Sequence, residues 1–386
     1  SISEATDIMK DVSRKDVDTS DKLTKENNIK VTDFGVDILK NSFGEDGNTL
    51  ISPISVIYAL GMTANGADGN TLSEMEGTFG LSLDELNGYL NAYLKTLASS
   101  EGAKFNIANS IWIREDENLN PSEDFLQKNK DYLDAKIYEA KFNIDTAKEI
   151  NNWVSDNTSG LIDSIIDEIS DDAMMYLINA LALTAEWESP YSEGQVTEDD
   201  FTKINNEKEK TEFMFSKLNS YIEGENETGF LKYYKDRKYA FAALLPNEDI
   251  NINDYVKSLN GEKVNNLLSK VEDKETLTTI PKFESEFSYI LNDSLKSMGI
   301  KRAFSPEESD FSKMGADLFI SSILHKTYIS VHELGTEAGA VTAVIMESTS
   351  MPIEEPKEVF LNRPFVYMII DTENNVPLFL GTYNGK

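Results

Sequence analysis

Two histidines and two closely spaced glutamates are the residues whose types and spacing could support chemistry. His325 and His332 stand seven residues apart in HKTYISVH, and Glu186 and Glu188 flank Trp187. Paired imidazoles can bind a metal ion, and paired carboxylates can act as general acid and base. An odd spacing on a strand places two side chains on opposite faces, and among 68 Asp and Glu residues such carboxylate pairs arise by chance. We therefore expect no metal ion at these residues.

The sequence also lacks the motifs of the common catalytic and cofactor-binding sites. It has no cysteine, and neither HExxH, GxSxG, a Walker loop nor GxGxxG occurs in it. No set of residues is left to carry a reaction. We predict that the protein is not an enzyme and uses no cofactor.

The charge balance restricts the partners. The 386 residues include 36 Lys and Arg against 68 Asp and Glu, a formal net charge of −32. Such a chain repels phosphate backbones and anionic lipid, so we expect neither nucleic acid nor a membrane as partner. No apolar run reaches the roughly 18 residues of a membrane span. A chain that begins at Ser1 fits the loss of a leader, and we expect an extracellular or cell-surface protein.

The order of helical and strand patterns favours one α+β domain. Residues 1–27 alternate in charge sign without a wide apolar face, which predicts an extension or a short solvated helix. A single domain over 28–386 follows, with helices in its first half, Ser52 as the cap of one of them, and strands in its second half. The apolar segment MYLINALALTAEW is typical of a central strand covered on both faces.

The segment HELGTEAGAVTAVIMESTSMP, residues 332–352, is unusual in so charged a chain. Between Glu333 and Lys357 it has no basic residue. By itself it could be a weak Ala-rich helix or an irregular loop. Strict alternation gives a third reading, because one of its two faces is small and uncharged throughout: Thr336, Ala338, Ala340, Thr342, Val344 and Met346. Such a strand could insert between two others.

Several blocks in a fixed order resemble the serpins, the serine protease inhibitor family, over about residues 28–386. The segment GTEAGAVTAV resembles the family's reactive-loop hinge, and NTLISPISVIYALGM, LINALALTAEW, LHKTYISVHELGTEAG, IPKFESEFSYILNDSLKSMGI, FLNRPFVYMI and VPLFLGTY resemble further family blocks. The resemblance implies about nine helices packed on three β-sheets, with an exposed reactive-centre loop at about 333–356. It implies loop-hinge residues Glu333, Gly335, Thr336, Glu337, Ala338, Gly339 and Ala340. It also implies residues that control loop insertion: Ser52, Pro53, Ser55, Asn179 and His325 in a region called the shutter, and Trp187 at the breach, near the point where the loop enters the sheet.

The resemblance also implies a mechanism and a bond. A serine protease attacks the loop as a substrate, the cut loop inserts into the main sheet, and the covalent acyl-enzyme is trapped. In inhibitory serpins a glutamate lies 17 residues from, and including, the residue before the scissile bond. Counting from Glu333 gives 349 − 333 + 1 = 17, hence Thr349-Ser350. Bonds after Ser348, Ser350 or Met346 remain alternatives. The flanking bait residues are Met346, Glu347, Ser348 and Met351.

The bait residues suggest the class of target. Threonine is small and uncharged and suits the shallow pocket of an elastase-like or subtilisin-like protease, whereas a trypsin-like protease finds no Lys or Arg between Glu333 and Pro356. We expect a monomeric inhibitor of prokaryotic type that forms a covalent complex with its protease. The alternative is a non-inhibitory serpin that acts as a binding, carrier or chaperone module, against which the small uncharged hinge argues.

Overall fold

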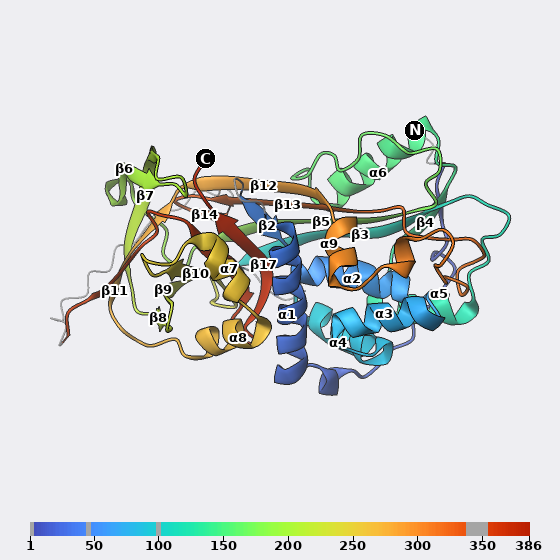
Figure 1. The fold of residues 1–386 in the computed structure, drawn as a ribbon, viewed down its shortest axis with the longest axis horizontal. Helices are drawn as coiled ribbons and strands as arrows, with labels where there is room; N and C mark the ends of the chain where they lie inside the picture. The colour runs from blue at the N-terminus through green and yellow to red at the C-terminus, as the bar shows by residue number, and fades with distance from the viewer. Residues whose placement is uncertain (1–3, 44–47, 98–101, 337–353) are drawn as a thin grey trace.

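The computed structural model describes residues 4–43, 48–97, 102–336 and 354–386. Over these residues the chain forms nine α-helices and three β-sheets, which confirms the predicted α+β fold (Figure 1). The helices are α1 (Lys25–Ser42), α2 (Pro53–Ala64), α3 (Gly69–Phe79), α4 (Leu83–Leu97), α5 (Glu123–Leu133), α6 (Ile144–Asn157), α7 (Ile252–Ser258), α8 (Gly261–Ser269) and α9 (Asn292–Met298). None of these helices is long and apolar enough to cross a membrane.

The main sheet has the strand order β1-β4-β3-β5-β13-β12, and a short strand β14 also pairs with β5. Its strands are β1 (Thr6–Asp7), β3 (Ala103–Arg114), β4 (Ile137–Ala140), β5 (Met175–Glu186), β12 (Phe283–Ile290), β13 (Ser322–Val331) and β14 (Gly335–Thr336). The central strands β5 and β13 run parallel, while their outer neighbours β3 and β12 are antiparallel to them. Strand β12 pairs with β13 along its whole length, as far as Ile290 opposite Leu324.

Two smaller sheets complete the fold at the end of the molecule away from α3 and α5 (Figure 1). The six-stranded sheet has the order β2 (Thr49–Ile51), β17 (Val376–Tyr383), β16 (Phe365–Asp371), β10 (Tyr239–Pro246), β9 (Glu227–Tyr233) and β8 (Tyr221–Glu223). The four-stranded sheet has the order β15 (Lys357–Phe360), β11 (Thr276–Pro281), β7 (Lys208–Leu218) and β6 (Val196–Thr202).

The main sheet is covered on both faces, so side chains that alternate along a strand enter two different cores. Leu181 and Leu183 of β5 belong to the large core beside α2, whereas Ala180 and Ala182 pack in a smaller cluster with residues of α6. Figure 1 shows α6 and α2 on opposite sides of the sheet. This explains the continuous apolar run of β5, which has no solvent face along most of its length.

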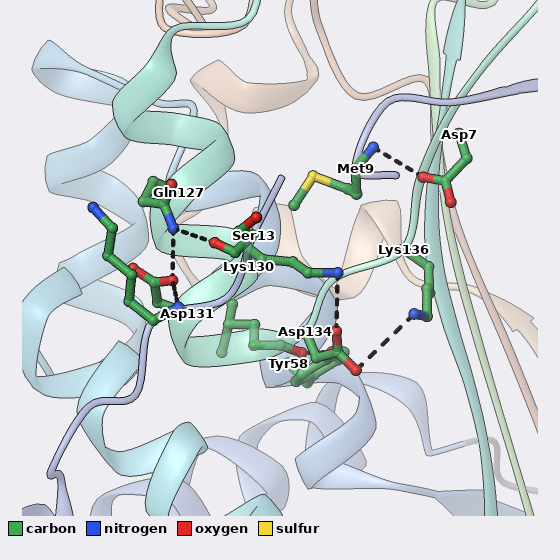
Figure 2. A network of polar contacts seen from close by, with 11 residues as sticks. Asp7, Met9, Ser13, Tyr58, Gln127, Lys130, Asp131, Asp134 and Lys136 are labelled. Carbon is green, nitrogen blue, oxygen red and sulfur yellow. Dashed lines mark hydrogen bonds and ion pairs between the residues drawn. The ribbon is translucent and has the colours of Figure 1, made fainter. Parts of the chain in front are cut away.

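Residues of the N-terminal extension pack on the domain rather than standing in solvent. Strand β1 pairs antiparallel with β4 and forms an edge of the main sheet. The Met9 side chain is 2% exposed and lies in the large core. Figure 2 shows Gln127 donating to the Ser13 carbonyl and to the Asp131 carboxylate. The Asp131 carboxylate also accepts from the Lys15 amide at 2.8 Å. The sequence pattern of residues 1–27 did not predict this packing, because a two-residue strand and one buried methionine give no periodic signal.

Replacing Met9 with alanine is expected to destabilise the protein by about 2–3 kcal/mol, since a buried methionine leaves a cavity when truncated. Fluorescence-monitored urea unfolding would measure this loss. Val12→Ala is the control, because Val12 is only half-buried and its truncation should cost less than about 1 kcal/mol. Equal effects of the two substitutions would mean that the extension is not docked in solution.

Candidate functional site

A tight turn at the end of β13 redirects the chain toward β5. The amide of His332 donates to the Gly335 carbonyl at 2.9 Å, and the Gly335 amide donates to the His332 carbonyl at 3.2 Å. Gly335 and Thr336 then pair antiparallel with Glu186 and Ala185 of β5. The first residues of the predicted loop hinge therefore already form a short strand beside β5.

Only glycine fits at position 335 without strain. Its φ is +140°, and a Cβ there would lie 2.2 Å from the Ala185 carbonyl oxygen. Gly335→Ala is expected to separate β14 from β5 and to lower the stability by about 2 kcal/mol or more. Thermal unfolding measures the change, and Gly194→Ala is the control, because a Cβ at Gly194 meets nothing within 4 Å. An unchanged melting temperature for Gly335→Ala would contradict this geometry.

Trp187 fixes this turn to the sheet at the breach. Its indole Nε1 donates to the His332 carbonyl at 2.8 Å, and its amide donates to the Leu334 carbonyl at 3.0 Å. The ring is 2% exposed and stacks on Tyr234 at a centroid distance of 4.4 Å. The residue that resemblance placed at the breach thus lies in direct contact with the segment that leads into the loop.

Glu333 is held through both its backbone carbonyl and its side-chain carboxylate. Its carbonyl accepts from the Tyr191 amide at 2.8 Å, and its carboxylate pairs with Lys282 at 3.0 Å. Partial burial would raise the pKa of Glu333, but a backbone hydrogen bond and Lys282 hold this pKa below its ordinary value. The pair is about one-third exposed, so solvent screening keeps its contribution to stability small. Its main effect is to orient the Glu333 side chain.

The shutter residues form one buried network under the central strands. His325 Nδ1 lies in hydrogen-bond contact with Asn179 Oδ1 across the β5–β13 pair, and the Ser52 amide donates to His325 Nε2 at 3.2 Å. Burial lowers the pKa of His325 to about 3. The ring is therefore neutral at physiological pH, with Nδ1 as donor and Nε2 as acceptor. It ties both central strands to the start of α2.

Local sequence sets the position of α2 in this network. Ser52 caps the helix, as the sequence predicted, with its Oγ accepting from the Ser55 amide at 3.3 Å. Pro53 occupies the first turn, where its missing N–H costs no hydrogen bond. Every residue of α2 is buried. The helix is thereby fixed against the sheet, which places the Ser52 amide under His325.

One network residue was missed from the sequence. Asn109 of β3 stands opposite Asn179 and exchanges hydrogen bonds with Ser55, its Oδ1 accepting from Ser55 Oγ at 2.8 Å. The available signal was an asparagine inside the apolar strand KFNIANSIWI, since buried polar groups need partners. Asn179 Nδ2 finds no hydrogen-bond partner among the described residues, so the closed sheet carries an unmet buried donor.

The remaining predicted residues divide into two groups. Glu186 and Glu188 form exposed ion pairs with Lys235 at 3.9 Å and Arg237 at 3.5 Å, and His332 lies in the hinge turn, seven residues beyond His325. Among the described residues no group of three or more metal-ligand side chains comes together. Ten predicted residues lie outside the described part of the chain: Glu337, Ala338, Gly339, Ala340, Met346, Glu347, Ser348, Thr349, Ser350 and Met351.

This geometry allows one particular rearrangement of the main sheet. The parallel pair β5–β13 has seven register pairs, from Tyr176↔Ser322 to Ala182↔Tyr328. Strand β14 is antiparallel to β5, and because β13 is parallel to β5, an extension of β14 between them would be antiparallel to both. Antiparallel pairs are slightly more stable per residue than parallel ones. Insertion of a further strand would therefore replace one parallel pairing with two antiparallel pairings.

Comparisons with known proteins agree with this arrangement. Residues 30–385 match the family model for Serpin (serine protease inhibitor). Intracellular coagulation inhibitor 2 of Tachypleus tridentatus is 30% identical over 365 residues, covering 91% of this chain and 89% of the relative. The native-state crystal structure of the thermophilic serpin tengpin aligns over 100% of both chains, with 43% identity and a TM-score of 0.92.

The latent state of tengpin aligns less well. Its TM-score is 0.81 at 41% identity, covering 97% of this chain and 100% of that one. This structure, in which β5 pairs directly with β13, is thus more similar to the native than to the latent state of tengpin. From the matched family model, the curated relative and the fold, this chain belongs to the serpin family of serine protease inhibitors.

Proposed function

We propose that this serpin is a suicide-substrate inhibitor that traps its protease by inserting the cut loop between β5 and β13. The observation that carries the proposal is the pairing of Gly335 and Thr336 with β5. This strand has the direction that insertion requires, and it begins at the breach beside Trp187. The loop would continue an existing strand rather than start a new one.

The length of β5 supports the proposed bond. Thr336 pairs with Ala185, and the same register continued along the strand would put Met346 opposite Met175, the first residue of β5. Thr349 would then pass the far end of the strand, carrying an attached protease the length of the sheet. The 349 − 336 + 1 = 14 residues span about 45 Å as a strand. New backbone pairs and buried aliphatic groups would together supply on the order of 10 kcal/mol.

The proposed target is an elastase-like or subtilisin-like protease. It would attack the Thr349-Ser350 bond and be trapped at the acyl-enzyme stage. Two features support this choice. Thr349, the residue before the proposed bond, is small, and no basic residue lies between Glu333 and Pro356. Glu347, Glu354 and Glu355 would favour approach of a basic protease. We propose an extracellular or cell-surface monomer as the acting form.

Mixing the protein with equimolar pancreatic elastase tests the proposal. A covalent band that survives a denaturing gel, together with a released C-terminal peptide that begins at Ser350, is the expected result. A covalent band with a neighbouring peptide start would keep the trap and move the bond by one or two residues. Cleavage without a covalent band, for elastase and subtilisin alike, would overturn the inhibitory proposal in favour of a carrier or chaperone module.

A further inference from the structure

A cavity between the four-stranded sheet, β9 and the segment after β5 gathers positive charge in an acidic protein. Its volume is about 420 Å³. Lys217, Lys232 and Arg237 line it, against two carboxylates, Glu188 and Asp273. In a chain with a net charge of −32, a cavity with an excess of cations departs from the general charge balance. The volume accommodates roughly a dozen waters, or a small polyatomic ion with its hydration.

Lys232 is the central feature of this cavity. The residue is 2% exposed, and no described carboxylate lies within ion-pair distance of its ammonium. Its Nζ donates to the Ser189 carbonyl at 2.9 Å and lies 4.3 Å from the centre of the Tyr191 ring. A buried charge without a counter-ion is expensive, and one carbonyl and ring faces compensate it only in part. Burial accordingly lowers the pKa of Lys232 to about 7, against the opposing influence of Glu188.

The other two cations stand around the cavity in different settings. Lys217, at the end of β7, is exposed and has no ion pair with a described carboxylate. Arg237, in the turn between β9 and β10, lies over the Tyr233 ring at 4.0 Å and pairs with Glu188 at 3.5 Å. Three uncharged polar residues also line the cavity: Ser189, Asn219 and Ser220. The three cations could therefore contact one ligand from several sides.

We propose that this cavity binds a small dianionic oxyanion of the sulfate or phosphate type, with Lys232 at its base and Lys217 and Arg237 at its mouth. The anion supplies the counter-charge that Lys232 lacks, in a setting where charge-assisted hydrogen bonds are strong. The site lies directly behind the breach, because the Lys232 ammonium also stands 5.2 Å from the centre of the Trp187 ring. The inference does not depend on whether the reactive loop traps a protease.

Sulfate is the probe, since it keeps its double negative charge between pH 6 and 9. Tryptophan fluorescence is recorded while sulfate replaces chloride at constant ionic strength, which removes general salt screening. A saturable change is expected at pH 6 for the wild type, with at least tenfold weaker binding for Lys232→Met. Lys148→Met is the matched control, because Lys148 is an exposed lysine that lines another cavity, beside Trp153, and its loss should leave sulfate binding unchanged.

The pH dependence is a second test of the same site. The charged and titratable groups around Lys232 are Glu188 and Tyr191 after β5, Lys217 on β7, Arg237 after β9 and Asp273 before β11. Since Lys232 loses its proton as the pH rises through about 7, sulfate should bind at least tenfold more weakly at pH 9 than at pH 6. In Lys232→Met this dependence should disappear.

The outcomes separate the proposal from general salt effects. No saturable signal at pH 6, or equal affinity in the wild type and Lys232→Met, would overturn it. Should Lys232→Met fail to fold by circular dichroism, Lys217→Met at the exposed mouth replaces it, with an expected three- to tenfold loss of affinity. Unchanged affinity in that variant would likewise overturn the proposal. Parallel titrations with inorganic phosphate and glycerol 3-phosphate identify whether a free ion or a phosphomonoester is preferred.

Discussion

Replacing Ala338 with arginine is expected to turn the proposed trap into an ordinary substrate. The protease would still cut the loop, but insertion would be too slow to outrun hydrolysis of the acyl-enzyme. We expect the number of inhibitor molecules consumed per trapped protease to rise from near one to more than ten. This prediction rests on the proposed function and locates the step at which it would fail.

The physical reason follows from the register of β14. Thr336 pairs with Ala185, so the same register puts position 338 opposite Leu183 in the inserted state. Residues opposite each other in antiparallel strands project to the same face. Leu183 is 1% exposed and belongs to the large core beside α2. A guanidinium inserted there loses its hydration with no partner, at a cost of several kcal/mol.

The neighbouring position supplies the control. Position 337 would stand opposite Thr184, which is half-buried and projects to the other face of β5. Glu337→Arg therefore inserts a charge where one already exists, and we expect inhibition to persist. Denaturing gels and residual protease activity measure both variants. Full trapping by Ala338→Arg, or equal failure of the two variants, would contradict the register argued from β14.

Strand β5, helix α2 and the positions of Ser52, Asn179 and His325 could be predicted because their signals lie in short segments. The run MYLINALALTAEW forms β5, and the caps and small residues around Ser52 form α2 where expected. Resemblance then indicated which residues meet, and the structure brings Ser52, Asn179 and His325 together. Alternation alone would not have paired β5 with β13, because 147 residues separate the start of β5 at Met175 from the start of β13 at Ser322. Pairing over such distances leaves no local pattern.

Other parts of the site depend on tertiary contacts that no local pattern encodes. Met9 is buried only because β1 pairs with β4, and Asn109 gains its role only from its register with Asn179. The residues on either side of Lys232 in β9, Leu231 and Tyr233, are apolar and aromatic. Burial of a lysine between them contradicts the usual preference of lysine for exposed positions. Residues that break a local rule in this way point to sites that the sequence alone does not locate.

His325→Gln is expected to remove a large part of the acid sensitivity of the fold. Burial lowers the pKa of His325 to about 3, whereas an unfolded histidine titrates near 6.5. Between these values the unfolded chain binds a proton that the folded chain does not. Stability from this group is therefore fully present above about pH 6.5 and falls by about 1.4 kcal/mol for each unit as the pH decreases toward 3.

The variant separates this contribution from those of the many carboxylates, which both proteins share. At pH 8 the glutamine variant should be less stable by roughly 2 kcal/mol, because the buried contacts to Asn179 and the Ser52 amide are disturbed. This difference in the free energy of unfolding, the stability gap, should close near pH 5, since only the wild type loses the histidine contribution. Urea unfolding at pH 8, 6.5 and 5 measures it. A gap that stays constant would mean that His325 takes up its proton in the folded sheet, and that the ring can leave the Ser52 amide without opening β5 from β13.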